Sequence, residues 1–415
     1  MFSKTFISAV LASGVAFGSP LIRRDAFNWG QETVRGVNIG GWLVLEPWIT
    51  PSIFEAQDGS VVDEYTLCQN VPTAPLILLE HWETFATFED FQKIAAAGIN
   101  TVRIPIGYWA FQKFNDPYIQ GAQVFLDKAL EWCRQTGLKA WVDLHGAPLS
   151  QNGFDNSGQK MDTPGWEGDD SVNETLAVIE LIATKYASAQ YQDVVVAIEL
   201  LNEPLLVSLA DADTGDVLKG FYDSGYELVR DVSDTPIMLH DAFKDADYWT
   251  GFLMPSDNDA THVIIDHHEY QVFTDEEVAM SADEHAEYVC SAASSYTSSD
   301  HWHVVGEWSA ALTDCALYLN GYGIGARYDG TYPDSSYVAS CSGINSISSW
   351  NSTYGDDVRR YIETQLDVFE EGTDGWVFWN FKTERQVAEW DFLALIDAGI
   401  FPQPLTDRKF PSTCS

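Results

Sequence analysis

Short apolar segments alternate with amphipathic segments along most of this chain of 415 residues. Apolar runs predict buried strands, and segments with helical spacing of apolar residues predict helices. Strands are predicted over residues 34–44, 101–106, 139–145, 236–240, 262–267, 303–307 and 375–379, with one more running from residue 194 to the turn at Asn202-Glu203-Pro204. Strands that alternate with helices in this way favour a parallel sheet closed into a single (β/α)8 (TIM) barrel, with long loops at the carboxyl ends of the strands.

The helices between these strands carry recognisable start and stop signals. Thr87, with Asp90 three residues later, marks one helix start, and Gly98 marks its end. Further helices are predicted over residues 124–136, 172–187, 217–232, 275–294 and 356–370.

The chain is longer than a minimal barrel, which needs about 250 residues. The surplus forms loops, chiefly residues 146–170 and an insertion over 314–352, that could wall off a pocket. An open doubly wound sheet is the competing fold, but no Gly-x-Gly-x-x-Gly follows the first strand.

The first residues have the composition of an export signal. Lys4 precedes an apolar run over residues 6–17 and small residues follow, which predicts a signal peptide over residues 1–19. Arg23-Arg24 predicts a dibasic processing site that ends a short propeptide, residues 20–24, so one barrel domain spans residues 25–415. No later stretch reaches the roughly 18 uncharged apolar residues of a membrane span. We expect a secreted protein, extracellular or held in a cell wall.

Acidic residues dominate the charge balance, because 62 Asp and Glu stand against 22 Lys and Arg, a formal net charge of −40. Such a surface repels nucleic acid and anionic membranes, although the same excess also keeps a secreted protein soluble. The 15 Trp residues favour a carbohydrate ligand, since aromatic rings stack on the C–H faces of sugars. We expect a monomer with no nucleic-acid or membrane partner.

Cysteines in a secreted chain are read first as disulfides, and no Cys-x-x-Cys pair suggests a metal site. Cys133 shares a helical stripe with apolar residues, so it could equally be a buried free thiol. Asn173 and Asn351 begin glycosylation sequons, which also arise by chance. The six cysteines are Cys68, Cys133, Cys290, Cys315, Cys341 and Cys414.

Polar and aromatic side chains collect at the ends of the predicted strands. Core residues of a barrel are branched aliphatics, so this coincidence favours an active site. Singly, each residue has a plainer interpretation: Arg103 as a structural ion pair, His145 as a satisfied buried histidine, Trp379 as core. The set comprises Asn38, Glu46, Arg103, His145, Asn202, Glu203, His268, Tyr270, Glu307 and Trp379.

Two glutamates at separate strand ends, without a metal-ligand cluster or nucleotide loop, predict glycoside hydrolysis by a carboxylate pair that uses no cofactor. One carboxyl must carry a proton for the leaving oxygen, and the other must be ionised. Arg103 would favour the ionised form of Glu307, and the Tyr270 hydroxyl would hold it in line. Asn202 is suited to bond a sugar 2-hydroxyl. A barrel aldolase or isomerase would instead show a Schiff-base lysine or a phosphate site, and neither is evident.

Long motifs covering nearly the whole mature chain resemble glycoside hydrolase family 5, and within it the secreted fungal exo-β-1,3-glucanases. The strand-end residues match, including Asn202-Glu203-Pro204 and Gly306-Glu307-Trp308. The longer motifs are Arg35-Gly-Val-Asn-Ile-Gly-Gly-Trp, Asp143-Leu-His-Gly-Ala-Pro, Ser150-Gln-Asn-Gly-Phe-Asp-Asn-Ser-Gly, Asp266-His-His-Glu-Tyr-Gln-Val-Phe and Phe401-Pro-Gln-Pro.

The resemblance implies a role for each matching residue. Glu203 would be the general acid/base and Glu307 the nucleophile of a retaining enzyme. Phe381 stands where similar enzymes often carry Trp. The resemblance places Glu46 and Asp155 at the closed end of the pocket, and Phe154 and Phe273 as a clamp on the next glucose. Asn156 belongs to the matching loop motif. The residues that the resemblance places around the first sugar are Arg103, His145, Asn202, His268, Tyr270 and Trp379.

The resemblance also implies cysteine pairs. Cys290 would bond Cys414, and Cys315 would bond Cys341. Cys68 and Cys133 would then remain, either bonded to each other or free.

The leading hypothesis is a retaining exo-hydrolase that releases glucose from the non-reducing ends of β-1,3-glucan, with possible transfer to another sugar. An endo-acting or β-1,4-specific member of the family is the main alternative. A non-catalytic glucan-binding wall glycoprotein is a third. Retention predicts carboxyl groups about 5 to 5.5 Å apart, and inversion roughly 6.5 to 9.5 Å.

Overall fold

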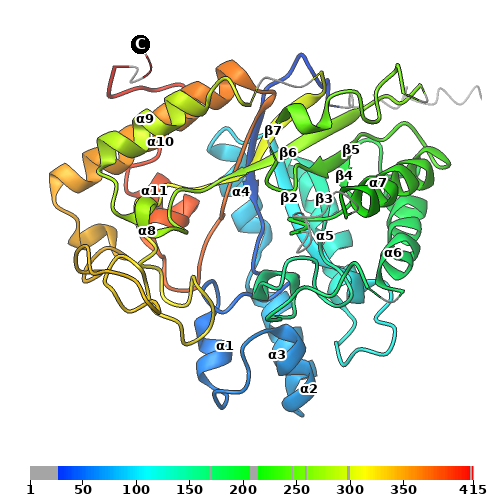
Figure 1. Ribbon diagram of the computed structural model, residues 1–415, viewed down its shortest axis with the longest axis horizontal. Coiled ribbons are helices and arrows are strands. Elements are labelled where there is room, and N and C mark those ends of the chain that lie inside the picture. Colours follow the sequence, from blue (N-terminus) through cyan, green and yellow to red (C-terminus); the bar gives the residue numbers. More distant parts are fainter. Residues whose placement is uncertain are drawn as a thin grey trace, which may run out of the picture.

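A closed barrel of parallel strands in chain order, β1 to β8, forms the centre of the molecule, which confirms the predicted (β/α)8 class (Figure 1). The computed structural model describes residues 27–168, 170–205, 214–244, 246–257, 259–296, 300–411 and 414. The predicted signal peptide and propeptide lie outside the described residues. The strands are β1 Val34–Asn38, β2 Thr101–Gly107, β3 Lys139–Gly146, β4 Val195–Glu199, β5 Ile237–His240, β6 Val263–Glu269, β7 Trp302–Trp308 and β8 Gly375–Phe378.

The strands are buried almost throughout because helices cover the outside of the sheet, so their sequences read as apolar runs. The predicted first strand, 34–44, was too long. β1 ends at Asn38 because the chain turns at Gly40 and Gly41, where Gly41 has a φ of +70°. A Cβ at Gly40 would lie 2.6 Å from the Trp379 ring, so the turn also requires glycine for close packing.

Helices occupy the outer layer, and their capping residues explain where most of them begin. The predicted start at Thr87 is confirmed, since its backbone N–H donates to Asp90 and its side chain accepts in return. The helices are α1 Pro51–Glu55, α2 Glu64–Asn70, α3 Ala74–Thr84, α4 Phe88–Ala96, α5 Ala122–Thr136, α6 Ser171–Tyr186, α7 Thr214–Arg230, α8 Asp275–Val278, α9 Ala282–Ala292, α10 Ser352–Gly372 and α11 Phe392–Asp397.

Two predicted helices differ from the structure. The helix predicted over residues 275–294 is in fact α8 followed by α9, because Ser281 opens a new capping box with Glu284. α10 begins at Ser352 rather than residue 356, because the Asn351 side chain accepts a hydrogen bond from the Tyr354 N–H at 2.8 Å. Helices α1, α2, α3 and α11 were not predicted, and the first three lie in the lower part of Figure 1.

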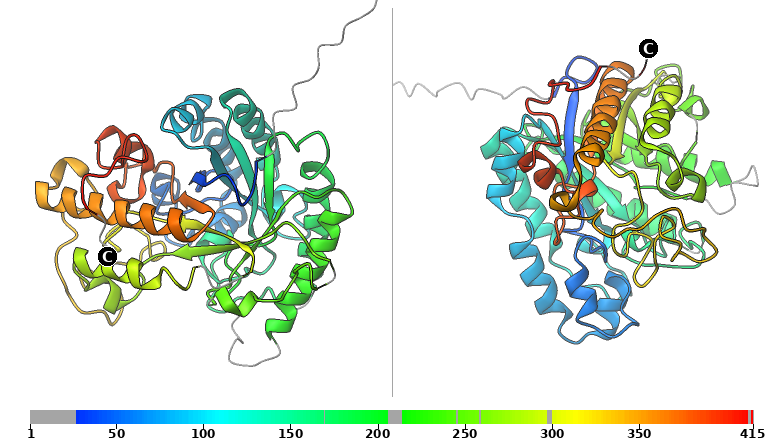
Figure 2. Two further views of the ribbon diagram at one scale, coloured as in Figure 1. Left: turned by 90° about the horizontal axis from the view of Figure 1, so that it is seen from above. Right: turned by 90° about the vertical axis from the view of Figure 1, so that its left-hand side faces the viewer.

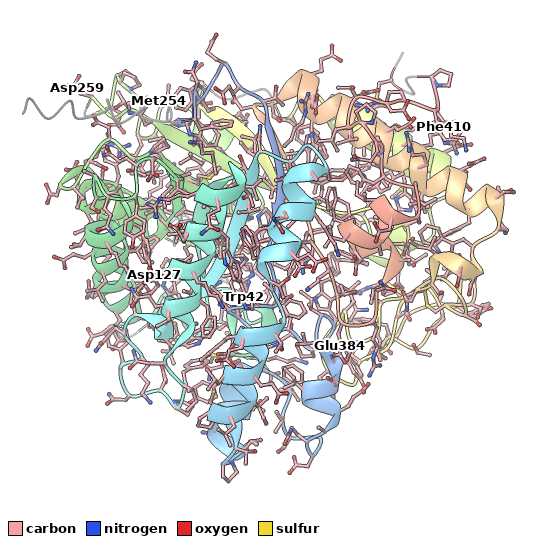
Figure 3. The ribbon with its side chains drawn as sticks, turned by 180° about the vertical axis from the view of Figure 1, so that it is seen from behind. Trp42, Asp127, Met254, Asp259, Glu384 and Phe410 are labelled. Carbon is pink, nitrogen blue, oxygen red and sulfur yellow. A yellow bond between two sulfur atoms is a disulfide. The ribbon has the colours of Figure 1, made fainter. Side chains whose placement is uncertain are left out.

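The amino-terminal end of the barrel is sealed by the segment that precedes β1. Phe27 and Trp29 pack with Trp141 and other interior side chains, and Trp29 donates its indole N–H to the Val196 carbonyl at 3.1 Å. A larger core lies between the sheet and the helices, where Trp42 is fully buried near the centre of Figure 3. A ligand site inside the barrel is therefore open only at the carboxyl ends of the strands.

Disulfides fasten two peripheral segments. Cys290 in α9 bonds Cys414, and Cys315 bonds Cys341, which are the pairs that the resemblance implied. Cys68 and Cys133 are free thiols, and Cys133 is fully buried in α5. Helices α9 and α10 lie side by side in both views of Figure 2, so the first disulfide ties the chain end to this pair. None of the helices in the described ranges is both long and apolar enough to span a membrane.

Candidate active site

One cavity of about 490 Å³ opens at the carboxyl ends of the strands. It has the concave shape and the mixture of aromatic and convergent polar groups that ligand sites share. The predicted site residues that line it are Glu46, Phe154, Asp155, Asn156, Glu203, Tyr270, Phe273, Glu307 and Trp379. The other predicted residues, Arg103, His145, Asn202 and His268, are buried and joined by hydrogen bonds, ion pairs or ring contacts to this lining or to one another.

Glu203 lies beyond the end of β4, on a backbone that is held from both sides. The side-chain amide of Gln151 donates to the backbone carbonyl of Asn202 at 2.9 Å. The backbone carbonyl of Gln151 accepts from the Leu205 N–H at 3.0 Å. Glu203 itself has a φ of 44°, an unfavourable region for a residue with a side chain. Strain of this kind is tolerated where the surrounding structure fixes a functional group.

Glu307 projects from β7 and receives the two contacts predicted for it. Arg103 donates to its Oε1 at 2.8 Å, and the Tyr270 hydroxyl donates to its Oε2 at 2.9 Å. The residue before it is glycine for a steric reason, because a Cβ on Gly306 would lie 2.0 Å from a carboxylate oxygen of Asp266. The sequence Gly-Glu at this strand end therefore reflects packing as well as chemistry.

Arg103 is both a buried ion pair and a site residue, so the two interpretations of it hold together. Its guanidinium is fully buried and contacts Glu199 at 2.8 Å, Asp143 at 3.1 Å and the Asn202 amide oxygen at 2.7 Å. Burial raises the pKa of Asp143 to about 6 and that of Glu199 to about 7. One guanidinium thus orients Glu307 while it partly compensates several buried carboxyls.

His268 joins the two glutamates. Its Nδ1 lies 2.8 Å from Glu203 Oε1 and 3.5 Å from Glu307 Oε2, and its Nε2 lies 3.2 Å from Asp266 Oδ2. Burial alone would lower the pKa of His268, but Glu307 and Asp266 outweigh burial and raise the pKa well above its ordinary value. His268 is therefore an imidazolium that holds both carboxyls close together.

The pKa values of the two glutamates are shifted in opposite directions. Burial would raise the pKa of Glu203, but the hydrogen bond and charge of His268 lower that pKa to about 2. Burial raises the pKa of Glu307 to about 8, against the effects of His268 and Arg103. Between these two values the pair of glutamates carries one proton, and Arg103 favours the ionised form of Glu307, as the sequence predicted.

His145 and Asn202 each present an unused polar atom. His145 donates from Nδ1 to Asp143 at 2.7 Å and stacks against the Trp379 ring at 5.6 Å. Burial and the charge of Arg103 lower the pKa of His145 to about 3, so the ring is neutral. The His145 Nε2 and the Asn202 Nδ2 are buried with no hydrogen-bond partner in the described structure, which leaves both available to a ligand.

Glu46 and Asp155 line the same cavity as Glu203 and Glu307, and burial raises the pKa of both. The Trp48 indole donates to Glu46 at 2.9 Å, yet burial, followed by the charge of Asp155, raises the pKa of Glu46 well above its ordinary value. Burial and Asp63 raise the pKa of Asp155 to about 7. Each carboxyl keeps one buried oxygen without a partner in the described ranges, which suits a hydroxyl-rich ligand.

Three exposed aromatic rings contribute to the lining of the cavity. Phe154 and Phe273 were predicted, and they expose 47% and 40% of their surface. Phe243, 48% exposed, was missed because the sequence search at strand ends looked chiefly for polar groups. Phe381, which replaces a Trp of similar enzymes, is fully buried against Phe85 and does not line the cavity.

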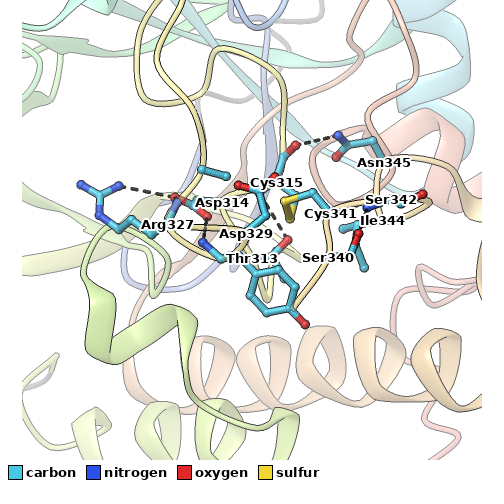
Figure 4. The surroundings of a disulfide bond; sticks show 12 residues. Thr313, Asp314, Cys315, Arg327, Asp329, Ser340, Cys341, Ser342, Ile344 and Asn345 are labelled. Atoms are coloured by element: carbon cyan, nitrogen blue, oxygen red, sulfur yellow. Dashed lines mark hydrogen bonds and ion pairs between the residues drawn. A yellow bond between two sulfur atoms is a disulfide. The ribbon is translucent and has the colours of Figure 1, made fainter. Parts of the chain in front are cut away.

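The insertion supplies a further part of the lining that the sequence did not reveal. Figure 4 shows the Cys315–Cys341 disulfide beside Asp314, which pairs with Arg327 at 3.5 Å. Arg327 in turn lies over the Tyr332 ring, with 3.8 Å to its centroid. The cavity residues missed by sequence reasoning are Trp48, Gly153, Lys160, Leu205, Phe243, Leu319, Asn320, Gly321, Arg327, Tyr332 and Trp390.

Two groups at the floor of the site have the spacing of metal ligands: Glu203 with His240 and His268, and Glu199 with Asp266 and His268. Both groups include His268, and each of its two ring nitrogens already bonds a carboxylate. The reaction proposed for this site therefore uses side chains alone. A larger hollow of about 780 Å³ lies between α3, α4 and α11, but none of the predicted site residues lines it.

Comparison with known proteins agrees with this geometry. The model of the family described as cellulase (glycosyl hydrolase family 5) matches residues 67–322. The chain belongs to family 5. This family 5 glycoside hydrolase is 47% identical to a glucan 1,3-beta-glucosidase of Yarrowia lipolytica over 98% of both chains. It is 46% identical to a glucan 1,3-beta-glucosidase of Candida oleophila, again over 98% of each.

The fold of this family 5 enzyme also resembles that of a rutinosidase from Aspergillus niger, with a TM-score of 0.73 and 19% sequence identity. The similarity covers 91% of this chain and 100% of the other. At this level of identity the likeness concerns the fold only.

Proposed function

We propose that this protein is a secreted, retaining exo-hydrolase that releases glucose from the non-reducing ends of β-1,3-glucan. The observation that carries the proposal is the placement of Glu203 and Glu307 on the same nitrogen of His268, within a sugar-sized cavity. The substrate class comes from the relatives named glucan 1,3-beta-glucosidase.

The separation of the carboxyl groups supports retention. Glu203 Oε1 lies 2.8 Å and Glu307 Oε2 lies 3.5 Å from the same nitrogen, His268 Nδ1. The distance between these two oxygens therefore cannot exceed the sum of the two contacts. This upper limit on the oxygen–oxygen distance is shorter than roughly 6.5 Å, the smallest separation of the carboxyl groups in inverting enzymes. Inverting enzymes need the larger separation because a water must fit between one carboxyl and the sugar. Glu307 is then close enough to attack the sugar itself.

In the proposed first step Glu203 must hold the one proton that the two glutamates share. His268 provides the path, since its Nδ1 proton passes to Glu203 while the Glu307 proton replaces it on Nδ1. Glu307 then attacks C1, the bond from C1 to the leaving oxygen breaks, and Glu203 protonates that oxygen. In the second step ionised Glu203 takes a proton from water, the water oxygen bonds C1, and the ester to Glu307 breaks. The Asn202 amide is free to bond the 2-hydroxyl in both steps.

Exo action is supported by the unpartnered carboxyl oxygens of Glu46 and Asp155, which suit the hydroxyls of a terminal glucose. The exposed rings of Phe154 and Phe273 offer faces for the next sugar. Transfer to a second sugar in place of water belongs to the same proposal, because that sugar would occupy the site vacated by the leaving group. The disulfides support an oxidising compartment, as expected for export. Glycosylation at the exposed Asn173 and Asn351 stays a prediction.

The decisive variant is Glu307→Gln, which keeps the shape of the side chain and removes the nucleophile. We expect turnover below about a thousandth of wild type with an unchanged melting temperature, because no covalent intermediate can form. Activity is measured on laminarin and on an aryl β-glucoside. A folded variant that retains more than about a tenth of the wild-type rate would contradict the assignment.

Product analysis separates the alternatives. Glucose alone from laminarin, formed first as the β-anomer, supports exo action with retention. A ladder of oligosaccharides would indicate endo action, and faster turnover of β-1,4-glucan would indicate the other linkage. Hydrolysis that Glu203→Ala abolishes excludes a merely glucan-binding wall protein.

A further inference from the structure

A buried histidine beside the acid/base residue has no role in the reaction described above. His240 is the last residue of β5 and is fully buried. Its ring centroid lies 4.4 Å from that of His268, with the two rings at 80°. A ring nitrogen of His240, a ring nitrogen of His268 and a carboxylate oxygen of Glu203 all lie within 4.8 Å of one another.

Backbone contacts fix the tautomer of His240. Its Nδ1 accepts a hydrogen bond from the Ala242 N–H at 3.0 Å, so Nδ1 carries no proton and the neutral ring carries its proton on Nε2. Burial, reinforced by the charge of His268, lowers the pKa of His240 well below its ordinary value. The nearby Asp241 carboxylate is 3.8 Å from Nδ1, beyond hydrogen-bond range.

The Nε2–H of His240 is buried without a hydrogen-bond partner in the described part of the chain. An unpaired buried donor is unfavourable, so such atoms call for an explanation. Glu203 supplies one, because a carboxylate oxygen of Glu203 lies within 4.8 Å of a ring nitrogen of His240, and the other ring nitrogen, Nδ1, already accepts from Ala242. The other charged groups that act on His240 are Arg103 and His267.

We propose that His240 is a positioning residue that donates its Nε2–H to ionised Glu203, directly or through one water, and so favours the second step of the reaction over the first. This inference rests on the proposed function, because double displacement uses Glu203 protonated in one step and ionised in the next. A hydrogen bond to a carboxylate is about twice as strong as one to a neutral carboxyl. The donor therefore stabilises the form of Glu203 that removes a proton from water.

Two variants separate the donor from the backbone contact. In His240→Asn the amide oxygen can replace Nδ1 as acceptor for Ala242, but nothing replaces Nε2. In His240→Gln the amide nitrogen can reach the position of Nε2, but the acceptor for Ala242 is lost. The inference predicts opposite defects in the two proteins.

Kinetics with an activated aryl β-glucoside, for which the second step limits turnover, gives the test. For His240→Asn we expect kcat to fall about tenfold, because the second step is slowed. KM should fall by the same factor, since kcat/KM reports the first step and stays within about threefold of wild type. The acid limb of kcat should also move to higher pH by about one unit, since Glu203 loses a donor to its ionised form. Its melting temperature should match wild type.

For His240→Gln we expect near-normal kcat with a lowered melting temperature. Equal kinetic defects in both variants, or a fall in kcat/KM as large as the fall in kcat for His240→Asn, would show a merely structural role and overturn the inference. Should neither variant fold, nitrogen NMR of labelled histidine in the wild-type protein decides. A neutral Nε2–H resonance that does not titrate supports the inference, and its absence overturns it.

A separate measurement keeps this inference distinct from the proposed function. A 2-deoxy-2-fluoro-β-glucoside should add one sugar mass to Glu307 in the wild-type protein. Failure to label Glu307, with release of the α-anomer, would refute double displacement itself. Labelling with unchanged kinetics in His240→Asn would refute only the role of His240.

Discussion

At the scale of single residues, the active site depends on donors that surround acids in a buried space. Glu307 accepts from Arg103 and Tyr270, and Glu203 accepts from His268 and from the Asn156 amide at 3.1 Å. Burial opposes ionisation of both acids, and the donors decide how far each is ionised. The result is that the pKa of Glu203 lies below its ordinary value and that of Glu307 lies above it.

Tyr270→Phe tests this balance at one contact. Loss of the hydroxyl removes a donor to ionised Glu307, so the upper pKa of the pair, about 8 in the wild-type protein, should rise by up to about one unit. The basic limb of kcat/KM then moves to higher pH. We expect the plateau to fall about tenfold to a hundredfold because Glu307 is less firmly oriented. A pH profile on an aryl β-glucoside measures both effects, and a basic limb that moves to lower pH would contradict the prediction.

At the scale of elements, β5 and β6 are joined on the outside of the barrel by a charged histidine. His267 Nδ1 lies 2.5 Å from Asp241 Oδ2, and its Nε2 lies 3.4 Å from Glu269 Oε2. Burial would lower the pKa of His267, but Asp241 and Glu269 outweigh burial and raise it to about 10. His267 is adjacent in sequence to His268, so this ion pair fixes the strand that carries the residue between the two glutamates.

The raised pKa predicts a pH-dependent contribution of His267 to stability. The unfolded-state pKa is about 6.5, so the stabilisation is fully present below that pH and is lost as pH rises through about 10. The difference in free energy of unfolding between wild type and His267→Gln should therefore be large near pH 6 and small near pH 10, by urea titration.

His303 provides a matched control for this measurement. It lies on β7, and burial lowers its pKa to about 4, so it is neutral throughout the same pH interval. The effect of His303→Gln should stay constant above about pH 7.5, where His303 is neutral in both the folded and the unfolded chain, and below that pH it should change in the opposite direction to the effect of His267→Gln. A constant effect for His267→Gln as well would show that no charged histidine joins the two strands.

At the scale of the whole molecule, the barrel is sealed at its amino end and elaborated at its carboxyl end. Trp29 and its neighbours close the amino end. Helices α1, α2 and α3 and the insertion extend from the carboxyl end (Figure 1). The disulfides tie down two segments outside the sheet. One closes a loop of 124 residues between α9 and the chain end, and the other closes 26 residues within the insertion.

The two disulfides should differ in what their removal does. Loop-closure entropy predicts a loss of about 5 kcal/mol for Cys290→Ser with Cys414→Ser, and about 3.5 kcal/mol for Cys315→Ser with Cys341→Ser. Only the second pair should also raise KM for laminari-oligosaccharides, because it adjoins Asp314, which holds Arg327 in the cavity lining. Urea unfolding and steady-state kinetics measure both effects.

Cys68→Ala serves as the control for loss of a cysteine without loss of a crosslink, and it should leave KM unchanged. The reverse ranking, with the shorter loop giving the larger loss of stability, would contradict the entropic account.

Local sequence was sufficient for features whose cause is local. The predicted strands and most of the helices exist because burial on both faces selects apolar runs, and because capping residues such as Thr87 act on atoms three residues away. The prediction from local sequence was wrong where a capping signal was overlooked. Ser281 caps a new helix and so divides one predicted helix into α8 and α9. The motifs around Glu203 and Glu307 pointed to two acids that the structure brings together in one cavity, because carboxylates have few structural uses at strand ends.

Only the tertiary structure decided how those residues act together. No spacing in the sequence relates His268 to both glutamates, Arg103 to the buried acids, or Asp266 to the glycine before Glu307, because each contact joins side chains from different strands. The opposite pKa shifts of the two glutamates and the free Nε2–H of His240 follow from those contacts and from burial. The sequence by itself determined the barrel and the two acids, whereas their proton balance arises only when the closed sheet brings distant charges into one dry space.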